Sequence, residues 1–238
     1  MSFWSVARDR FLTRFGPQTC LVEPDLRVVV SGDMPRRVRE ALRDGRYEAP
    51  ERSIARALLQ SDDRVLDIGA GFGTVALIAA RICAPGNVLA FEPNPASVAI
   101  FMRNSDLNGL RPRIVTSAIT GSGGPTPFLI SDDPLSSRID PAGAAAPVPS
   151  QRFGDVIERF RPSVVIMDVE GAETELLRTP LPQTVRALMV EIHPETSDPT
   201  PMIEALEDDG FSLDRALSLG QVLVLRRSAA LSPRAAKG

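Results

Sequence analysis

The chain has 238 residues, of which 43% are hydrophobic and 24% charged, and a formal net charge of −3 at pH 7. This length allows one domain with a full core or two small ones. The small net charge gives no general attraction to nucleic acid or to anionic membranes, and two cysteines are too few for a disulfide framework. The first residues contain no apolar core of a secretory signal, so we expect a cytoplasmic protein without a nucleic-acid or membrane partner.

The pattern along the chain divides it into three parts. Residues 1–45 form an N-terminal extension, irregular apart from a short strand at 26–30 and a basic helix at 35–43. Residues 46–227 alternate strands and helices and are expected to form one domain. Residues 228–238 read as a disordered tail.

Within the domain, short apolar runs predict strands at 65–68, 88–91, 113–119, 126–130, 164–167 and 187–192. Helices are expected between them, including one at 96–108 that ends at Gly109. Segments 211–217 and 221–226 predict a closing antiparallel hairpin. Alternating strands and helices indicate an α/β fold with a mostly parallel sheet that is covered on both faces. Residues 131–150 lack periodicity and predict a long loop, which we expect to border the part of a ligand site where a substrate would enter.

A glycine-rich turn follows the first strand of the domain. The strand carries Asp67 near its end, and glycines follow at positions 69, 71 and 73. The next strand ends at Glu92, where an acid can bind both hydroxyls of a ribose. A dinucleotide fingerprint has the spacing G-x-G-x-x-G, which differs from this one. The pattern therefore favours S-adenosylmethionine over NAD as the cofactor.

Several runs of this chain resemble the FkbM family of S-adenosylmethionine-dependent methyltransferases, over about residues 47–225. They are Tyr47-Glu48; the turn 65–73, with Phe72 at a position that is often Ile; 91–95 with Asn104 and Leu107-Asn108-Gly109; 167–173; and Glu191-Ile192-His193. The turn is generic to class I methyltransferases, whereas the run Asp-Val-Glu-Gly-Ala-Glu at 168–173 is specific. The resemblance implies a Rossmann-like class I methyltransferase fold with a mostly parallel seven-stranded sheet. It also implies O-methylation of a hydroxyl, commonly on a sugar or a secondary metabolite.

Most of the expected cofactor-binding residues lie at or next to the carboxyl ends of predicted strands, where α/β sheets bind ligands. They are Tyr47, Glu48, Asp67, Gly69, Ala70, Gly71, Gly73, Thr74, Glu92, Pro93, Asn94, Ser117, Ala118 and Asp168. The resemblance alone implies the roles of Tyr47 and Glu48. Many class I enzymes carry an acid near the adenine, but this chain has Ser117 and Ala118 there.

The expected catalytic residues are His193, Asp168 and Glu170, at the ends of two later strands. His193 is the only histidine, and a reference pKa near 6.5 suits a general base. The alternatives are a structural histidine and a Glu170 that only caps a helix. Asp168, Glu170 and Glu191 could instead offer oxygen ligands to Mg²⁺, although we do not expect a divalent metal.

Two other function classes remain open at this point. An NAD-type oxidoreductase is disfavoured by the glycine spacing and by the lack of a Tyr-x-x-x-Lys pair, since Lys237 is the only lysine. A non-catalytic S-adenosylmethionine-binding protein would not need His193. The expected partner is a small hydroxylated acceptor molecule, and a homodimer stays open.

Overall fold

The computed structural model describes residues 18–32, 34–131, 137–140, 142–193 and 198–228. The expected tail lies outside these residues apart from Ser228, as do residues 1–17 of the extension. Among the helices described, none is long and apolar enough to cross a membrane.

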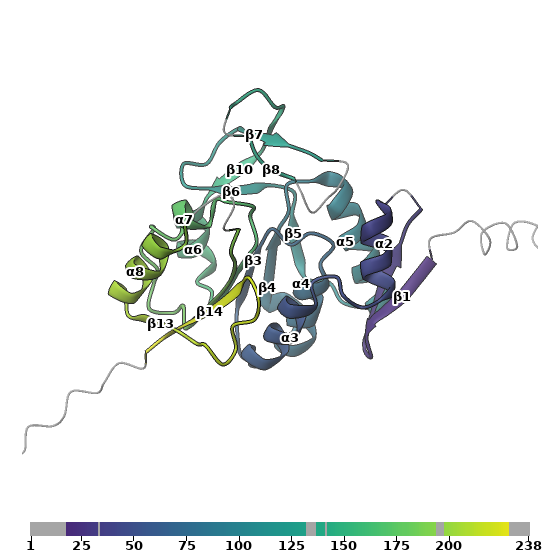
Figure 1. Cartoon of the computed structure of the whole chain (residues 1–238), viewed down its shortest axis with the longest axis horizontal. Coiled ribbons are helices and arrows are strands. Elements are labelled where there is room, and N and C mark those ends of the chain that lie inside the picture. Colours follow the sequence, from purple (N-terminus) through teal and green to yellow (C-terminus); the bar gives the residue numbers. More distant parts are fainter. Residues whose placement is uncertain (1–17, 33, 132–136, 141, 194–197, 229–238) are drawn as a thin grey trace, which may run out of the picture.

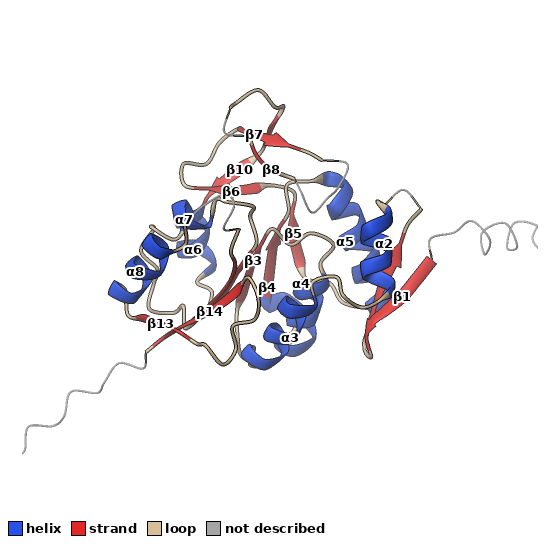
Figure 2. Cartoon of the chain, viewed as in Figure 1, coloured by secondary structure: helices blue, strands red, loops and turns tan. Residues whose placement is uncertain are grey.

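A seven-stranded sheet forms the centre of the molecule (Figures 1 and 2). Its spatial order is β13 (Phe211–Leu213), β14 (Val222–Arg227), β12 (Ala187–Glu191), β11 (Val164–Met167), β3 (Val65–Ile68), β4 (Val88–Phe91) and β5 (Arg113–Val115). The five strands from β12 to β5 are parallel, and β14 runs antiparallel to both β12 and β13. The predicted α/β fold, the mostly parallel sheet and the C-terminal hairpin are confirmed.

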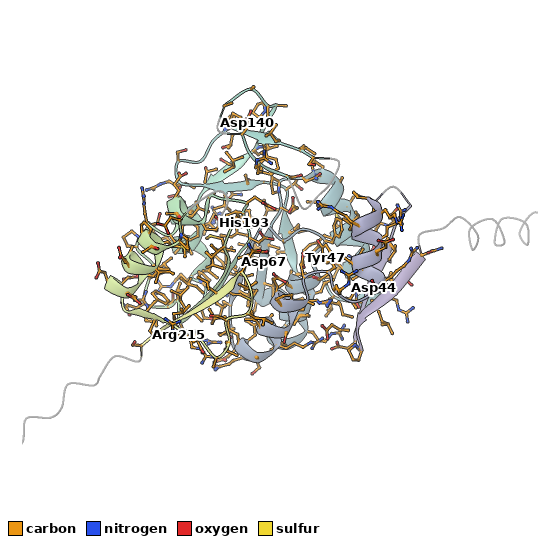
Figure 3. The ribbon with its side chains drawn as sticks, viewed as in Figure 1. Asp44, Tyr47, Asp67, Asp140, His193 and Arg215 are labelled. Carbon is orange, nitrogen blue, oxygen red and sulfur yellow. The ribbon has the colours of Figure 1, made fainter. Side chains whose placement is uncertain are left out.

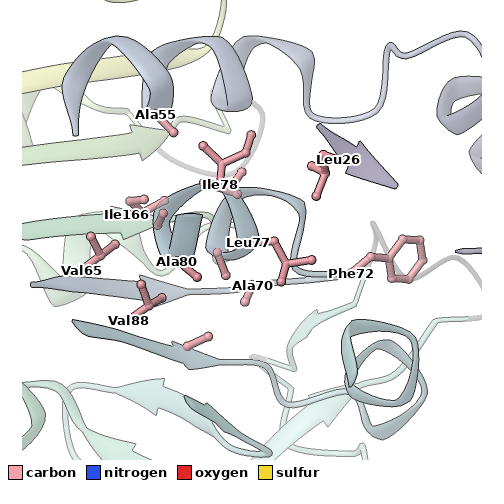
Figure 4. Close-up of a cluster of buried hydrophobic side chains, with 14 of the residues drawn as sticks. Leu26, Ala55, Val65, Ala70, Phe72, Leu77, Ile78, Ala80, Val88 and Ile166 are labelled. Atoms are coloured by element: carbon pink, nitrogen blue, oxygen red, sulfur yellow. The ribbon is translucent and has the colours of Figure 1, made fainter. Parts of the chain in front are cut away.

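Helices cover both faces of this sheet because its central strands are apolar on both sides. On one face, α3 (Ala49–Leu58) and α4 (Thr74–Cys83) pack through residues such as Ala55 and Ile78 (Figure 4). On the other, α6 (Phe153–Phe160) and α8 (Thr200–Asp208) pack through Phe153 and Leu206. The long helix α5 (Pro95–Asn108) follows β4 and ends at Gly109 in the left-handed conformation, as predicted.

The N-terminal extension contains a hairpin, and the sequence predicted only one of its two strands. The expected strand at 26–30 is β2 (Leu26–Val30), but its partner β1 (Gln18–Glu23) was not predicted. Helix α2 (Arg36–Arg43) follows, close to the expected basic helix. Figure 1 shows this unit in purple beside α5. Leu26 and Val28 join the same hydrophobic cluster as α3 and α4, so the hairpin packs against the main domain.

Two predictions between β5 and α6 were wrong. The expected strand at 113–119 is two strands, because the chain turns sharply where the Ser117 amide donates to the Val115 carbonyl. After that turn, β6 (Ala118–Thr120) leaves the central sheet and pairs with β10 (Ser150–Arg152). The expected loop at 131–150 contains β8 (Arg138–Ile139) and β9 (Pro147–Val148) in its described part.

These two strands pair with β7 (Thr126–Leu129) on either side and form a small separate sheet. Figure 1 shows it above the carboxyl ends of the central strands, and we call the described residues 126–131, 137–140 and 142–148 the cap. The remaining elements are η1 (Pro85–Asn87) and α7 (Glu173–Leu176), which follows β11.

Candidate active site

The glycine turn after β3 is closely packed against its neighbours. Gly69 has φ +84°, and a Cβ there would lie 1.6 Å from the backbone oxygen of Asp168. At Gly73 a Cβ would lie 2.3 Å from the Phe101 ring. At Gly71 a Cβ would meet only the ends of two side chains, the Tyr47 hydroxyl at 3.3 Å and a Glu48 carboxylate oxygen at 3.4 Å. Two of the three glycines are therefore needed for packing, and the third lies against movable groups.

Glu92 stands directly beside this turn. Its Oε2 accepts a hydrogen bond from the Gly71 amide at 2.9 Å, and its Oε1 accepts one from the Asn94 amide at 2.7 Å. Burial raises the pKa of Glu92 to about 7. The two amides hold the carboxylate at the tip of β4, next to the turn, as the strand-end position predicted.

Asn104 of α5 connects the turn to the N-terminal hairpin. Its side-chain amide donates to the Phe72 carbonyl at 2.9 Å, and its oxygen accepts from the Val29 amide at 2.8 Å. Asn104 is fully buried, so both hydrogen bonds are shielded from water. Asn104 therefore links the N-terminal hairpin to the glycine turn by hydrogen bonds.

A cavity of about 410 Å³ opens above the carboxyl ends of the central strands. This volume lies within the range of about 300–1,000 Å³ that is usual for small-molecule sites. Its wall extends from Glu92 and Ser117, beyond β4 and β5, to Asp168 and His193, beyond β11 and β12. The cap contributes the apolar side chains of Phe128 and Ile139.

Tyr47 and Glu48 lie on the wall formed by the start of α3. The Tyr47 ring stacks on Phe72 with centroids 5.4 Å apart, and its hydroxyl is buried beside the Glu48 carboxyl. Glu48 has a left-handed backbone and accepts a hydrogen bond from the Thr74 hydroxyl. Burial raises the pKa of Glu48 to about 8, so this carboxyl holds its proton at neutral pH in the ligand-free protein.

A second, much smaller cavity of about 20 Å³ lies behind the turn. Glu48, Glu51, Asp67, Asp168 and Glu191 line it together with apolar residues. Burial, and then the nearby charge of Glu92, raise the pKa of Asp67 to about 7. Its Oδ2 is buried without a hydrogen-bond partner among the described residues. Acidic side chains therefore surround the turn from both sides.

His193 follows β12 and lines the main cavity at its β11–β12 end, whereas Glu92 follows β4, with β11 and β3 between the two strands. Figure 3 labels His193 near the centre of the molecule in this view. The Nε2 of His193 is 3.7 Å from Asp168 Oδ1 and 3.6 Å from Glu170 Oε2, while its Nδ1 is 3.0 Å from Glu173 Oε1. Burial raises the pKa of Asp168 well above its usual range, and Glu191 and Glu48 add to this effect. Glu170 has a left-handed backbone, with φ +51°, directly after this strand end.

Three side chains at this end could hold a cation. Ligand-type atoms of Asp168, Glu170 and His193 lie within 4.8 Å of one another. Glu191, a metal candidate from the sequence, lines the cavity but is not part of this group. A metal bound to His193 through Nε2 would prevent this nitrogen from accepting a proton as a general base.

Most of the predicted site residues lie around the two cavities. Those that line the main one are Tyr47, Glu48, Gly69, Gly71, Glu92, Pro93, Ser117, Ala118, Asp168, Glu170, Glu191 and His193, and Asp67 and Ala70 line the smaller one. Gly73, Thr74 and Asn94 line neither: Gly73 packs against Phe101, Thr74 bonds Glu48, and Asn94 caps α5.

The sequence did not reveal several other residues of the wall. Arg46 and Glu51 flank the Tyr47-Glu48 pair, and Phe128 and Ile139 come from the cap. The short apolar run at 126–130 was a signal for Phe128, but nothing local to Glu51 or Ile139 indicates a site.

Comparison with solved structures gives distant likenesses. Magnesium protoporphyrin IX methyltransferase from Synechocystis PCC 6803, with bound SAM, is 16% identical with a TM-score of 0.48, over 94% of this chain and 92% of that one. TYW2 from P. horikoshii, in complex with MeSAdo, is 12% identical with a TM-score of 0.49, over 89% and 71%. Methyltransferase FkbM from Methylobacillus flagellatus KT is 12% identical with a TM-score of 0.47, over 71% of this chain and 45% of that one.

Comparison at the level of sequence gives a clearer result. No curated protein matches this chain. The sequence model of the methyltransferase FkbM domain matches residues 67–213, which is more than half of the chain. That range contains the glycines of the turn, Glu92, the run at 168–173 and His193, which carried most of the resemblance, but not Tyr47-Glu48. The protein therefore belongs to the FkbM methyltransferase family.

Proposed function

We propose that this protein transfers a methyl group from S-adenosylmethionine to a hydroxyl group of a sugar or a secondary metabolite, with His193 as the general base. The observation that carries the proposal is the shape of the main cavity. One continuous space joins Glu92 and the glycine turn to the His193, Asp168 and Glu170 end. Cofactor and acceptor can therefore meet inside it.

The residues around the turn suit the cofactor. The Glu92 carboxylate would accept hydrogen bonds from the ribose hydroxyls, and Ser117, Ala118 and Phe128 would enclose the adenine. The turn leaves room at Gly71 for the amino-acid part of S-adenosylmethionine, because glycine has no Cβ to fill this space. The acids around the turn suit a ligand that carries a sulfonium and an ammonium group. No phosphate would bind well against so many carboxylates.

The other end of the cavity suits the activation of a hydroxyl. S-adenosylmethionine, when bound, supplies an electrophilic methyl group on a sulfonium sulfur. The distances of 3.6 and 3.7 Å from His193 Nε2 to Glu170 and Asp168 are too long for hydrogen bonds, so an acceptor oxygen can lie among the three groups. There Nε2 accepts the hydroxyl proton as the oxygen attacks, and the two carboxyl groups orient the acceptor. A positioned base contributes about 10²–10⁴-fold to such a reaction.

Calorimetry tests the choice of cofactor. We expect S-adenosylmethionine and S-adenosylhomocysteine to bind, and NAD to bind much more weakly. Glu92→Ala should weaken the binding of both adenosyl ligands, because the ribose hydroxyls lose their acceptor. Equal or tighter binding of NAD would contradict the proposal and favour an oxidoreductase.

A transfer assay tests the catalytic part separately. The protein is incubated with S-adenosylmethionine labelled on its methyl group and with a panel of sugars and hydroxylated metabolites. Labelled O-methyl products identify an enzyme and its acceptor class. Tight cofactor binding without transfer to any acceptor, in contrast, supports a non-catalytic binding protein.

A further inference from the structure

We propose that Glu173 is a positioning residue: it holds the Nδ1–H of His193, so that the lone pair of Nε2 faces the cavity. The proposal rests on the role of His193 given above, but it concerns a residue to which neither the sequence motifs nor the comparisons assign a role. Glu173 does not line the main cavity, and it would act only through the histidine.

The contact itself is short and shielded. Glu173 Oε1 lies 3.0 Å from His193 Nδ1. The Glu173 side chain is 1% exposed and that of His193 is 10% exposed. At the other ring nitrogen, Nε2, the distances to Glu170 and Asp168 are 3.6 and 3.7 Å. Glu173 is thus within hydrogen-bond distance of Nδ1, whereas Asp168 and Glu170 lie beyond that distance from Nε2.

The backbone before α7 explains how Glu173 reaches this place. Glu170 and Gly171 have φ values of +51° and +103°, so the chain reverses directly after β11. Glu173 is the first residue of the short helix α7. The Gly171 amide donates to the same Oε1 at 3.1 Å and fixes the carboxylate under the imidazole. The run at 168–173 therefore supplies three carboxylates to one histidine.

Protonation decides which ring nitrogen of His193 can accept a proton. Burial favours the neutral form of Glu173, but the hydrogen bonds from His193 and Gly171 outweigh it and lower the pKa of this carboxyl. An ionised carboxylate can only accept, so in the neutral imidazole the proton is on Nδ1 and not on Nε2. The Glu173 hydrogen bond also raises the pKa of His193, against the effect of burial. Among the described residues, the other titratable groups near the ring are Asp168, Glu170 and Glu191.

A purely structural role explains Glu173 less well. Its second oxygen, Oε2, is buried and has no hydrogen-bond partner among the described residues. A buried carboxylate that is not fully paired costs stability compared with a neutral group of the same shape. This loss of stability is explained if Glu173 orients a general base. The partner of one ring nitrogen commonly fixes a histidine in a single tautomer.

The test uses the fact that His193 is the only histidine in the chain. Its ring nitrogens give the only imidazole signals in a ¹⁵N NMR spectrum, so no assignment is needed. In the full-length protein we expect a neutral ring with Nδ1 protonated and a pKa above 6.5. In Glu173→Gln the pKa should fall by about one unit or more, because the ring loses a charged partner, and the Nε2–H tautomer should become populated.

The control variant is Glu175→Gln, which removes an exposed carboxylate from the same helix and should leave both signals unchanged. A wild-type ring protonated on Nε2 would overturn the proposal even if Glu173→Gln does not fold. An unchanged pKa and tautomer in a folded Glu173→Gln would overturn it as well.

Turnover adds a readout that a merely structural role would not change. Activity needs a neutral imidazole, so a lower histidine pKa should move the acid limb of the pH profile to lower pH. Glu173→Gln should also lower kcat, and it should bind S-adenosylhomocysteine as tightly as the wild type. If the NMR result holds but His193→Ala keeps full turnover, the positioning stands and the general-base proposal fails.

Discussion

Replacement of Gly71 by alanine separates the cofactor-binding role of the glycine turn from its packing role. The added Cβ would lie 3.3 Å from the Tyr47 hydroxyl and 3.4 Å from a Glu48 oxygen, both at the ends of side chains. These atoms can move, so the protein should fold. The methyl group would stand where the turn faces the cavity, however, and should oppose the approach of the cofactor.

The expected magnitudes follow from this geometry. At φ +50°, alanine costs about 1–2 kcal/mol, which lowers the Tm of a chain of this size by about 2–8 °C. Intrusion of one methyl group into a packed contact costs about 1–3 kcal/mol, which corresponds to roughly 5–150-fold weaker cofactor binding. Gly69→Ala should be worse for folding, because its Cβ would lie 1.6 Å from the Asp168 backbone oxygen and would push β3 from β11.

The assay combines calorimetry with S-adenosylhomocysteine and thermal unfolding. Gly109→Ala is the matched control: Gly109 also has a left-handed backbone, with φ +64°, but nothing lies within 4 Å of its Cβ position and it is remote from the cavity. It should lose a similar amount of stability and keep wild-type affinity. If Gly71→Ala binds the ligand as tightly as Gly109→Ala, the cofactor does not approach this turn and the reasoning is refuted.

Three further predictions follow from the site. His193→Ala should lower turnover by about 10²–10⁴-fold with unchanged cofactor affinity, and the deficit should shrink at high pH; full activity at every pH would remove the base assignment. EDTA should leave activity unchanged, whereas a loss that Mg²⁺ restores would make Asp168, Glu170 and His193 metal ligands. Burial raises the pKa of Glu92 and Asp67 to about 7, so above about pH 4 these groups bind more protons in the folded chain than in the unfolded chain. The Tm of the ligand-free protein should therefore fall between about pH 4 and pH 7. A Tm that rises across this window contradicts those pKa values.

The parts of the fold that could be predicted are those whose signal is local in the sequence. Strands such as β3 and β11 are short apolar runs because both of their faces are buried. Gly109 ends α5 because the helix closes with a residue in the left-handed conformation, which glycine adopts without strain. The positions of Glu92 and His193 follow from the rule that ligands bind beyond the carboxyl ends of parallel strands.

The parts that were missed depend on contacts between distant segments. Strand β1 alternates poorly and is half exposed, so only its pairing with β2 defines it. The cap strands β8 and β9 are two residues long each and exist because β7 lies between them. Glu51 and Ile139 reach the cavity from α3 and the cap, and no pattern within either segment could show that they share a wall.

The electrostatics of the site and the charge of the proposed cofactor support each other. Glu48, Asp67, Glu92 and Asp168 all have raised pKa values, and burial is the first cause in each case. In the ligand-free protein burial therefore favours the protonated form of these carboxyls near neutral pH, and neighbouring acids add to the effect for Glu48, Asp67 and Asp168. A cationic ligand reverses this preference, since it favours the ionised carboxylates. On the proposed function, binding of the sulfonium should release protons, and the affinity should rise with pH between about 6 and 8.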